Sequence, residues 1–143
     1  MTDAERAAIE QACLRLMAAY CITADHHDCE GWVGLFCEDG TWTQPTGEKR
    51  QGHDTLRTFF KGRPVNKLSR HVSTSALVTV IDEDHATGVS YALVLRGSQE
   101  LDGPVEAPVD CMTALVEYHD EFRRTPDGWR FQSRRGQTVF RRT

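Results

Sequence analysis

The residues best suited to chemistry lie in the segment Tyr20–Asp28, YCITADHHD, and at His71, far along the chain. Two carboxylates in this segment bracket two histidines, and His71 opens a stretch rich in valine and threonine. A carboxylate beside an imidazole favours proton transfer, because imidazole has an unperturbed pKa of about 6.5 and the carboxylate stabilises its protonated form. A proton-transferring pair of Asp25 and His71 is therefore one hypothesis, which requires that the fold bring the two residues together.

Both residues also have simpler interpretations. Asp25 lies near the end of an expected helix, where it can be a plain turn carboxylate, and a histidine at the start of a strand can bond only to backbone. The run from His26 to Glu30 contains imidazole, thiol and carboxylate groups that suit zinc or iron. Neighbouring residues on a helix or tight loop point in different directions, so we expect no metal site and no other cofactor.

The composition is that of an ordinary soluble domain. Of 143 residues, 39% are hydrophobic and 27% are charged, and this length fits a single domain over residues 1–143. No apolar run is long enough for a membrane span, and the polar, acidic N-terminus is unlike a signal peptide, so we expect a cytoplasmic protein without a membrane partner. Five cysteines without a CxxC pair indicate neither a disulfide framework nor a thiolate metal site.

The C-terminal segment is basic, although the whole chain has a formal charge of −4. Seven arginines but only one acidic residue lie between positions 122 and 143. These arginines alternate with apolar residues along strand-like segments, which indicates solvated strand faces or ion pairs across an oligomer interface. We therefore expect no nucleic-acid partner.

The first part of the chain predicts three helices. A capping-box pattern from Thr2 to Glu5 opens the first helix, and apolar residues then recur at helical spacing as far as Ala24. Asp28 is the expected cap of a short second helix over residues 29–37, and a third helix is predicted over 53–62. Short strands around 41–43 and 49–51 form a small hairpin between them.

From Ser69 onward the pattern changes to the alternation typical of strands. Four long strands are predicted over 69–82, 85–97, 109–124 and 129–141, separated by turn signals that include Gly103-Pro104. Their length indicates a strongly curved sheet. Helices followed by strands predict an α+β fold in which three N-terminal helices pack on the concave face of an antiparallel sheet.

The order of these elements resembles the SnoaL-like branch of the nuclear-transport-factor-2-like superfamily. The likeness runs along nearly the whole chain, through the stretches YCITADHHD, LFCEDG, SRHVSTS and VSYALVL, through Gly52, and through YHD ahead of GWR. It implies a cone-shaped barrel whose curved, mixed and mostly antiparallel sheet encloses a pocket. Members with dehydratase or dehydrochlorinase activity share an Asp-His pair at the positions of Asp25 and His71, and in one of them a tyrosine at the spacing of Tyr20 takes part.

These features predict a cofactor-free lyase or isomerase that acts, like a dehydratase, on a small hydrophobic oxygenated ring compound. His71 is the expected base, Asp25 orients it, and Tyr20 donates a hydrogen bond to a departing hydroxyl or to an enolate oxygen. The expected substrate contacts are Trp42, Phe59, Tyr91, Arg96 and Tyr118. The alternative is that the aromatic residues are plain core and that Arg96 lies on the surface. At Ala24 and Arg96 the chain departs from scytalone dehydratase, so no particular substrate is implied.

The same fold also supports proteins without catalysis. The alternative function is a ligand-binding protein, or a small-subunit partner of an aromatic-ring dioxygenase, because fold resemblance does not settle function. In either case we expect a homo-oligomer, a dimer or a trimer, since a curved sheet leaves one outer face to cover.

Overall fold

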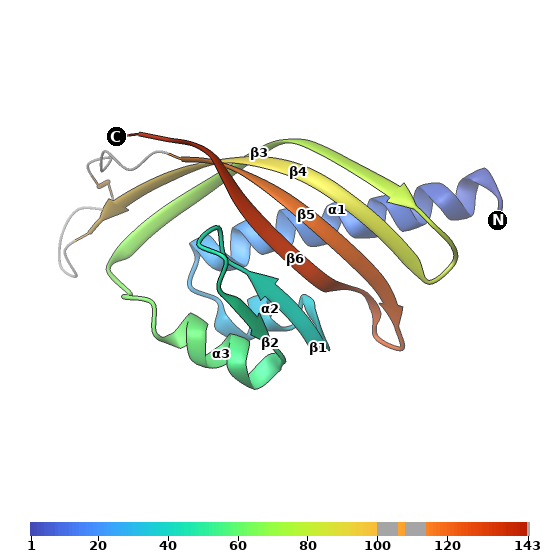
Figure 1. Ribbon diagram of the computed structural model, residues 1–143, viewed down its shortest axis with the longest axis horizontal. Helices are drawn as coiled ribbons and strands as arrows, with labels where there is room; N and C mark the ends of the chain where they lie inside the picture. The colour runs from blue at the N-terminus through green and yellow to red at the C-terminus, as the bar shows by residue number, and fades with distance from the viewer. Residues whose placement is uncertain (100–105, 108–113, 143) are drawn as a thin grey trace.

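The computed structural model describes residues 1–99, 106–107 and 114–142, which form three helices and a six-stranded sheet (Figure 1). The helices are α1 (Asp3–Asp25), α2 (Cys29–Val33) and α3 (His53–Lys61). The strands are β1 (Phe36–Thr43), β2 (Lys49–Gln51), β3 (Lys67–Val80), β4 (His85–Ser98), β5 (Ala114–Thr125) and β6 (Gly128–Arg141).

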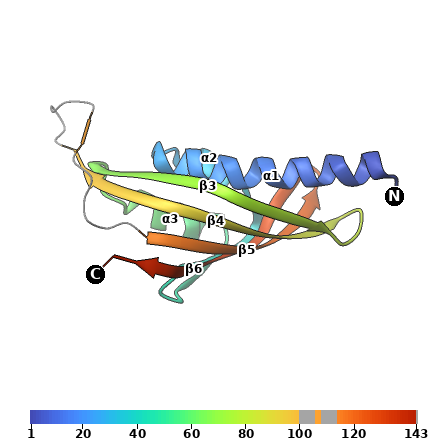
Figure 2. The ribbon, with the colours of Figure 1, turned by 90° about the horizontal axis from the view of Figure 1, so that it is seen from above.

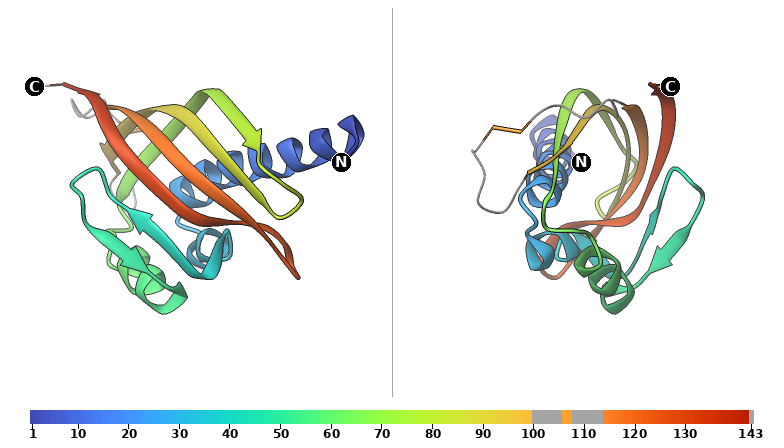
Figure 3. Two further views of the ribbon diagram at one scale, coloured as in Figure 1. Left: turned by 45° about the vertical axis from the view of Figure 1, so that its right-hand side comes forward. Right: turned by 90° about the vertical axis from the view of Figure 1, so that its left-hand side faces the viewer.

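The strands follow the order β2-β1-β6-β5-β4-β3 across one sheet. All neighbours pair antiparallel except β1 and β6, which pair parallel. The sheet is strongly curved (Figure 3), and α1 runs beside β3 (Figure 2) while α2 and α3 lie near the β1–β2 hairpin. The expected α+β fold with a curved, mixed and mostly antiparallel sheet is confirmed.

Capping residues set the ends of the first two helices as the sequence predicts. The Thr2 side chain accepts a hydrogen bond from the Glu5 amide, and Glu5 accepts one from the Thr2 amide at 2.7 Å, which makes a capping box. His27, with a φ of 55°, turns the chain after α1. Asp28 then caps α2 by accepting a hydrogen bond from the Gly31 amide at 3.0 Å.

The boundary between α2 and β1 differs from the prediction. The helix ends at Val33 instead of residue 37, and the strand begins at Phe36 instead of residue 41. Phe36 pairs with Phe131 of β6, and its ring packs against both Trp32 and Phe131. This tertiary pairing overrides the local helical pattern. The predicted Gly103-Pro104 turn and the beginning of the predicted strand 109–124 lie outside the described residues.

A β-bulge in β3 brings two sets of side chains to the interior. Thr74 has no pairing partner in β4, so β3 contains one extra residue at this point of the ladder. A one-residue insertion moves every later side chain to the opposite face of a strand. Ser69 and His71 before the bulge, and Val78 and Val80 after it, therefore all point to the inner side.

The core between the helices and the sheet is rich in aromatic rings. Trp32 lies centrally, with its ring centroid 5.1 Å from those of Phe36 and Phe60 and 5.7 Å from that of Trp42. Such pairs fix ring positions in addition to burying apolar area. No helix among the described residues is long and apolar enough to cross a membrane.

Candidate active site

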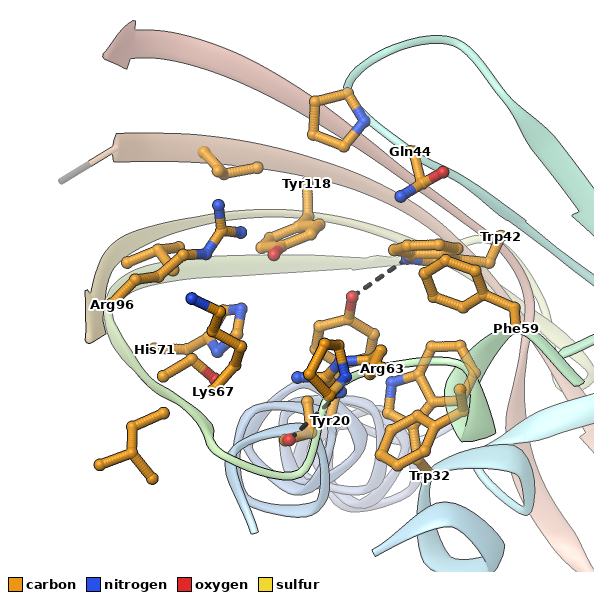
Figure 4. A pocket seen from close by; sticks show the side chains of 18 of the residues that line it. Tyr20, Trp32, Trp42, Gln44, Phe59, Arg63, Lys67, His71, Arg96 and Tyr118 are labelled. Atoms are coloured by element: carbon orange, nitrogen blue, oxygen red, sulfur yellow. Dashed lines mark hydrogen bonds between the residues drawn. The ribbon is translucent and has the colours of Figure 1, made fainter. Parts of the chain in front are cut away.

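A cavity of about 420 Å³ lies between the last turns of α1, the helix α3 and the inner face of the sheet (Figure 4). Its walls combine aromatic rings with a few polar groups. The aromatic residues that line it are Tyr20, Trp32, Trp42, Phe59, Phe60 and Tyr118, together with the imidazole of His71. A mostly apolar cavity with a small number of polar groups is the usual form of a small-molecule site.

Asp25 and His71 meet at the wall of this cavity. The Nδ1 atom of His71 lies 2.6 Å from Oδ1 of Asp25, and the backbone amide of His71 donates to Oδ2 at 2.7 Å. Ser69 Oγ donates to Oδ1 at 2.8 Å. The carboxylate thus orients the imidazole by both its ring and its backbone, and with Nδ1 turned toward Asp25, Nε2 is the nitrogen left for a bound molecule.

The hydrogen bonds to Asp25 also keep it ionised. The residue is 5% exposed, and burial acts to raise its pKa. The hydrogen bonds from the ring and backbone of His71, together with that from Ser69, outweigh burial and hold the pKa of the Asp25 carboxyl below its ordinary value. They also offset the unfavourable position of a negative charge at the C-terminal end of a helix.

His27 fastens the turn after α1 to the beginning of β3. Its Nε2 lies 2.9 Å from the backbone oxygen of Lys67, two residues before Ser69. This contact joins the two chain segments that carry Asp25 and His71, so the histidine pair next to Asp25 contributes a structural contact. Within the described part of the chain, no three histidine, cysteine, aspartate or glutamate side chains are grouped as a metal site.

Two buried tyrosines supply hydroxyl groups next to the pair. Tyr20 Oη accepts a hydrogen bond from Trp42 Nε1 at 3.0 Å, and a phenol that accepts one bond can still donate its own proton. The rings of Tyr20 and Tyr118 lie 5.5 Å apart between centroids, and that of Tyr20 lies 6.2 Å from His71. Burial raises the pKa of both tyrosines, so both phenols are neutral donors.

Arg134 lies buried against these tyrosines. Its guanidinium carbon is 4.1 Å from the ring centroid of Tyr20 and 4.0 Å from that of Tyr118, and Nη2 donates to Ser90 Oγ at 3.3 Å. Its Nε lies 3.4 Å from Oδ1 of Asp120. Cation–π contacts of this kind stabilise the orientation of both rings.

The ion pair between Arg134 and Asp120 is incompletely satisfied. Neither carboxylate oxygen of Asp120 has a hydrogen-bond partner among the described residues, nor do Nε and Nη1 of Arg134. Burial raises the pKa of Asp120 to about 6, against the attraction of Arg134, which lowers it. Asp120 is therefore a buried carboxyl that holds its proton more tightly than usual.

The burial of Arg134 corrects the expectation that the arginines of the last strand cover solvated faces. A strict alternation from Phe131 would turn position 134 outward. Pairing of β5 with β6 skips Gln132, and this bulge turns Arg134 to the inner face, where it is 1% exposed. The sequence has no signal that locates this bulge.

Most of the predicted contacts line the cavity, but one does not. Trp42, Phe59, Arg96 and Tyr118 are among its lining residues, with Tyr20 and His71. Tyr91 lies on the outer face of β4 and is 43% exposed. Its neighbours along the strand point inward, so strand alternation places its ring on the wrong side of the sheet for a bound molecule.

The sequence also matches a described protein family. The sequence model of the SnoaL-like domain family matches residues 5–135. The chain belongs to the SnoaL-like family. This family is part of the nuclear-transport-factor-2-like superfamily. The curved sheet and the three helices have the fold of that superfamily. No curated protein sequence matches this SnoaL-like chain.

Solved structures similar to this SnoaL-like chain span most of its length. A variant of a function-unknown protein from Mycobacterium tuberculosis is 30% identical, with a TM-score of 0.72 over 90% of this chain and 70% of that one. An NTF2-like protein with a cystatin-like fold from Novosphingobium aromaticivorans is 25% identical, with a TM-score of 0.72 over 90% and 80%. A hexachlorocyclohexane dehydrochlorinase from Novosphingobium barchaimii is 17% identical, with a TM-score of 0.80 over 98% and 92%, and shares the fold.

Asp120 makes the stability of the protein depend on pH in a defined window. Its pKa in the folded state is about 6, above the ordinary value of 3.8, so its contribution to stability is complete below pH 3.8 and is lost as the pH rises through 6. We expect the free energy of unfolding of the wild type, measured against that of Asp120→Asn, to fall by about 2 kcal/mol between pH 4 and 7.

Urea denaturation at several pH values measures this difference. The pKa of Asp25 is shifted downward, so its contribution is lost only as the pH falls below 3.8, outside this window. Asp127→Asn, in the exposed turn between β5 and β6, is the matched control. A difference between wild type and Asp120→Asn that stays constant from pH 4 to 7 contradicts the assignment.

Proposed function

We propose that this protein is a cofactor-free lyase or isomerase, dehydratase-like in mechanism, that acts on a small hydrophobic oxygenated ring compound. The observation that carries the proposal is the 2.6 Å contact between His71 Nδ1 and Asp25 Oδ1 at the wall of an aromatic-lined cavity. Membership of the SnoaL-like family supports the same class, since its fold is shared by a dehydrochlorinase.

In the proposed reaction, Nε2 of neutral His71 removes a proton from a carbon next to an electron-withdrawing group. Asp25 stabilises the imidazolium that forms, because its carboxylate is ionised and hydrogen-bonded to Nδ1. In an elimination, the electron pair of the C–H bond forms the new double bond, and the departing hydroxyl leaves as water with the proton from His71. In an isomerisation, His71 returns the proton to another carbon of the same molecule.

The tyrosines are the proposed donors to the oxygen on which negative charge develops. Tyr20 has its hydroxyl proton available while its oxygen accepts from Trp42, and Tyr118 lies beside it. Arg134 holds both rings in place from the side away from the cavity, since it contacts both rings but does not line the cavity. Donors that are fixed before the reaction stabilise developing charge most effectively.

Proton abstraction can be tested without knowledge of the final product. A set of cyclic ketones and hydroxylated ring compounds is incubated with the protein in deuterated water, and exchange at carbon is followed by NMR. We expect His71→Gln to slow exchange by about 10² to 10⁴, the usual contribution of a general base. Asp25→Asn should slow it to a similar extent, up to about 10⁴, because an amide can donate to Nδ1 and so favours the tautomer whose proton is on Nε2.

The surface pair of Asp82 and His85 provides a matched control. Its Nδ1–Oδ1 distance is 2.9 Å, but both side chains are exposed and away from the cavity. His85→Gln should leave exchange unchanged. Exchange that persists at the wild-type rate in His71→Gln overturns the proposal, and tight binding of a ring compound without any exchange favours the alternative of a non-catalytic ligand-binding protein.

We also propose that a second copy of the chain covers the outer face of the sheet. Val72, Leu93, Leu115 and Phe140 are cross-strand partners in one row over β3, β4, β5 and β6. Phe140 is 69% exposed, Val72 44% and Leu93 38%. A contiguous exposed apolar row of this kind is typical of an interface.

A charge placed in this row should disrupt the assembly. We expect the wild type to be a dimer or trimer by light scattering and Leu93→Glu to shift it to the monomer, because a buried, unpaired carboxylate is costly in an interface. Thr87→Glu, at an exposed position near the other end of the same strand, is the control. A wild type that is monomeric at high concentration contradicts the proposal.

A further inference from the structure

The cavity has a strong imbalance of charge. Three basic residues, Arg63, Lys67 and Arg96, are among its lining residues, and none of the described residues that line it is an aspartate or glutamate. Asp25, the carboxylate behind the wall, is already bound by Ser69 and His71.

The contacts of two of these basic residues leave their charge without an anionic partner. Arg63 Nη1 donates to the backbone oxygen of Ala24 at 3.3 Å, and its guanidinium lies 4.8 Å from the ring centroid of Phe60. Lys67 Nζ donates to Ser98 Oγ at 2.8 Å. These partners are neutral, so each contact satisfies hydrogen bonds but does not compensate the charge.

Burial and the positive charge of Arg96 both act on the guanidinium group of Arg63. Burial is the main cause that lowers the pKa of Arg63, and the positive charge of Arg96 adds a smaller lowering. Asp25 acts in the opposite direction without reversing the shift. Two neighbouring cations at a cavity favour an anion between them, since an anion would relieve both their desolvation and their repulsion.

Some arginines elsewhere on the molecule are paired with carboxylates. Arg57 bonds to Glu30 at 2.7 Å and Arg123 to Asp39 at 3.1 Å, both on the exposed surface. Among the described residues, the ion pairs involve no arginine that lines the cavity. Arg57 and Arg123 are thus neutralised by carboxylates of the chain, whereas Arg63 and Arg96 have no carboxylate within ion-pair distance among the described residues.

The positions of these groups suggest how a molecule would lie. In Figure 4, Arg96 and Lys67 lie on the same side of the cavity as His71, and Trp42 and Phe59 lie on the other side. A molecule with a charged end and an apolar ring matches this separation. Its charged end would contact the cations, and its ring would lie against the aromatic side chains.

We propose that the substrate of this cavity carries an oxyanion group, a carboxylate or a phosphate, held by Arg63 and Arg96 with Lys67 beside them. This inference names the substrate class of the proposed reaction and rests on that proposal for the role of His71, but anion binding itself does not require catalysis. Guanidinium groups suit both oxyanions, because their planar donors form two parallel hydrogen bonds.

Three probes of one shape test the proposal: 2-naphthoate, 2-naphthamide and 2-naphthyl phosphate. Binding is followed by the fluorescence of Trp32 and Trp42, which line the cavity, and by calorimetry. We expect at least one anionic probe to bind the wild type roughly tenfold more tightly than the neutral amide, as one charge-assisted hydrogen bond implies. Whichever anion shows the larger preference identifies the group as carboxylate or phosphate.

Substitutions of the basic residues locate the effect. Arg63→Gln and Arg96→Gln should each reduce the preference for the anion to about threefold or less, with binding of the amide unchanged. Arg135→Gln, at an exposed position of β6, is the control and should keep the preference. Circular dichroism verifies that each variant is folded.

Two results would overturn the proposal: equal binding of the amide and both anions by the wild type, or an anion preference that survives in both arginine variants. The His71→Gln variant separates this proposal from the proposed reaction, because it should keep the anion preference while it loses carbon exchange. Equal binding of charged and neutral probes with His71-dependent exchange would reject the anionic substrate alone. An anion preference without exchange in the wild type would reject the reaction alone.

Discussion

The carboxylate of Asp25 is the point on which the arrangement of the site depends. It accepts hydrogen bonds from Ser69 and from the backbone and ring of His71, so it ties the last turn of α1 to the beginning of β3. A buried carboxylate at the C-terminal end of a helix is unfavourable unless it is well hydrogen-bonded. The contacts that make this burial tolerable are the same contacts that orient the imidazole toward the cavity.

A second buried charge, that of Arg134, supports the two tyrosines that line the cavity. Arg134 lies against the rings of Tyr20 and Tyr118, and its pairing with Asp120 leaves polar atoms of both side chains without hydrogen-bond partners among the described residues. Such a pair is weak support for stability, because desolvation offsets much of the attraction. Its clearest effect is geometric, since the guanidinium fixes the two phenols that face the proposed substrate.

Much of the fold follows from patterns that are local in sequence. The capping box at Thr2, the cap at Asp28 and the alternation of the long strands each predict an element that the structure contains. The end of α2 and the beginning of β1 were predicted wrongly, because Phe36 is recruited to the sheet by a partner nearly a hundred residues away, Phe131. Local patterns do not reveal such a pairing.

The site was predictable only in part, for a related reason. The position of Asp25 next to His71 was expected from residue types and from family resemblance, and the inward direction of Arg96 follows from an unbroken alternation along β4. The same alternation turns Tyr91 outward. The burial of Arg134 depends on the bulge at Gln132, and a bulge is a property of the pairing between strands that neither strand encodes alone.

The tautomer of His71 tests the central claim most directly. Nitrogen-15 NMR of histidine-labelled protein distinguishes a protonated ring nitrogen from a free one. We predict that in neutral His71 the proton is on Nδ1, bonded to Asp25, while Nε2 is unprotonated and able to act as a base. A neutral His71 with its proton on Nε2 would contradict the account, because the nitrogen that faces the cavity would then have no lone pair to accept a proton.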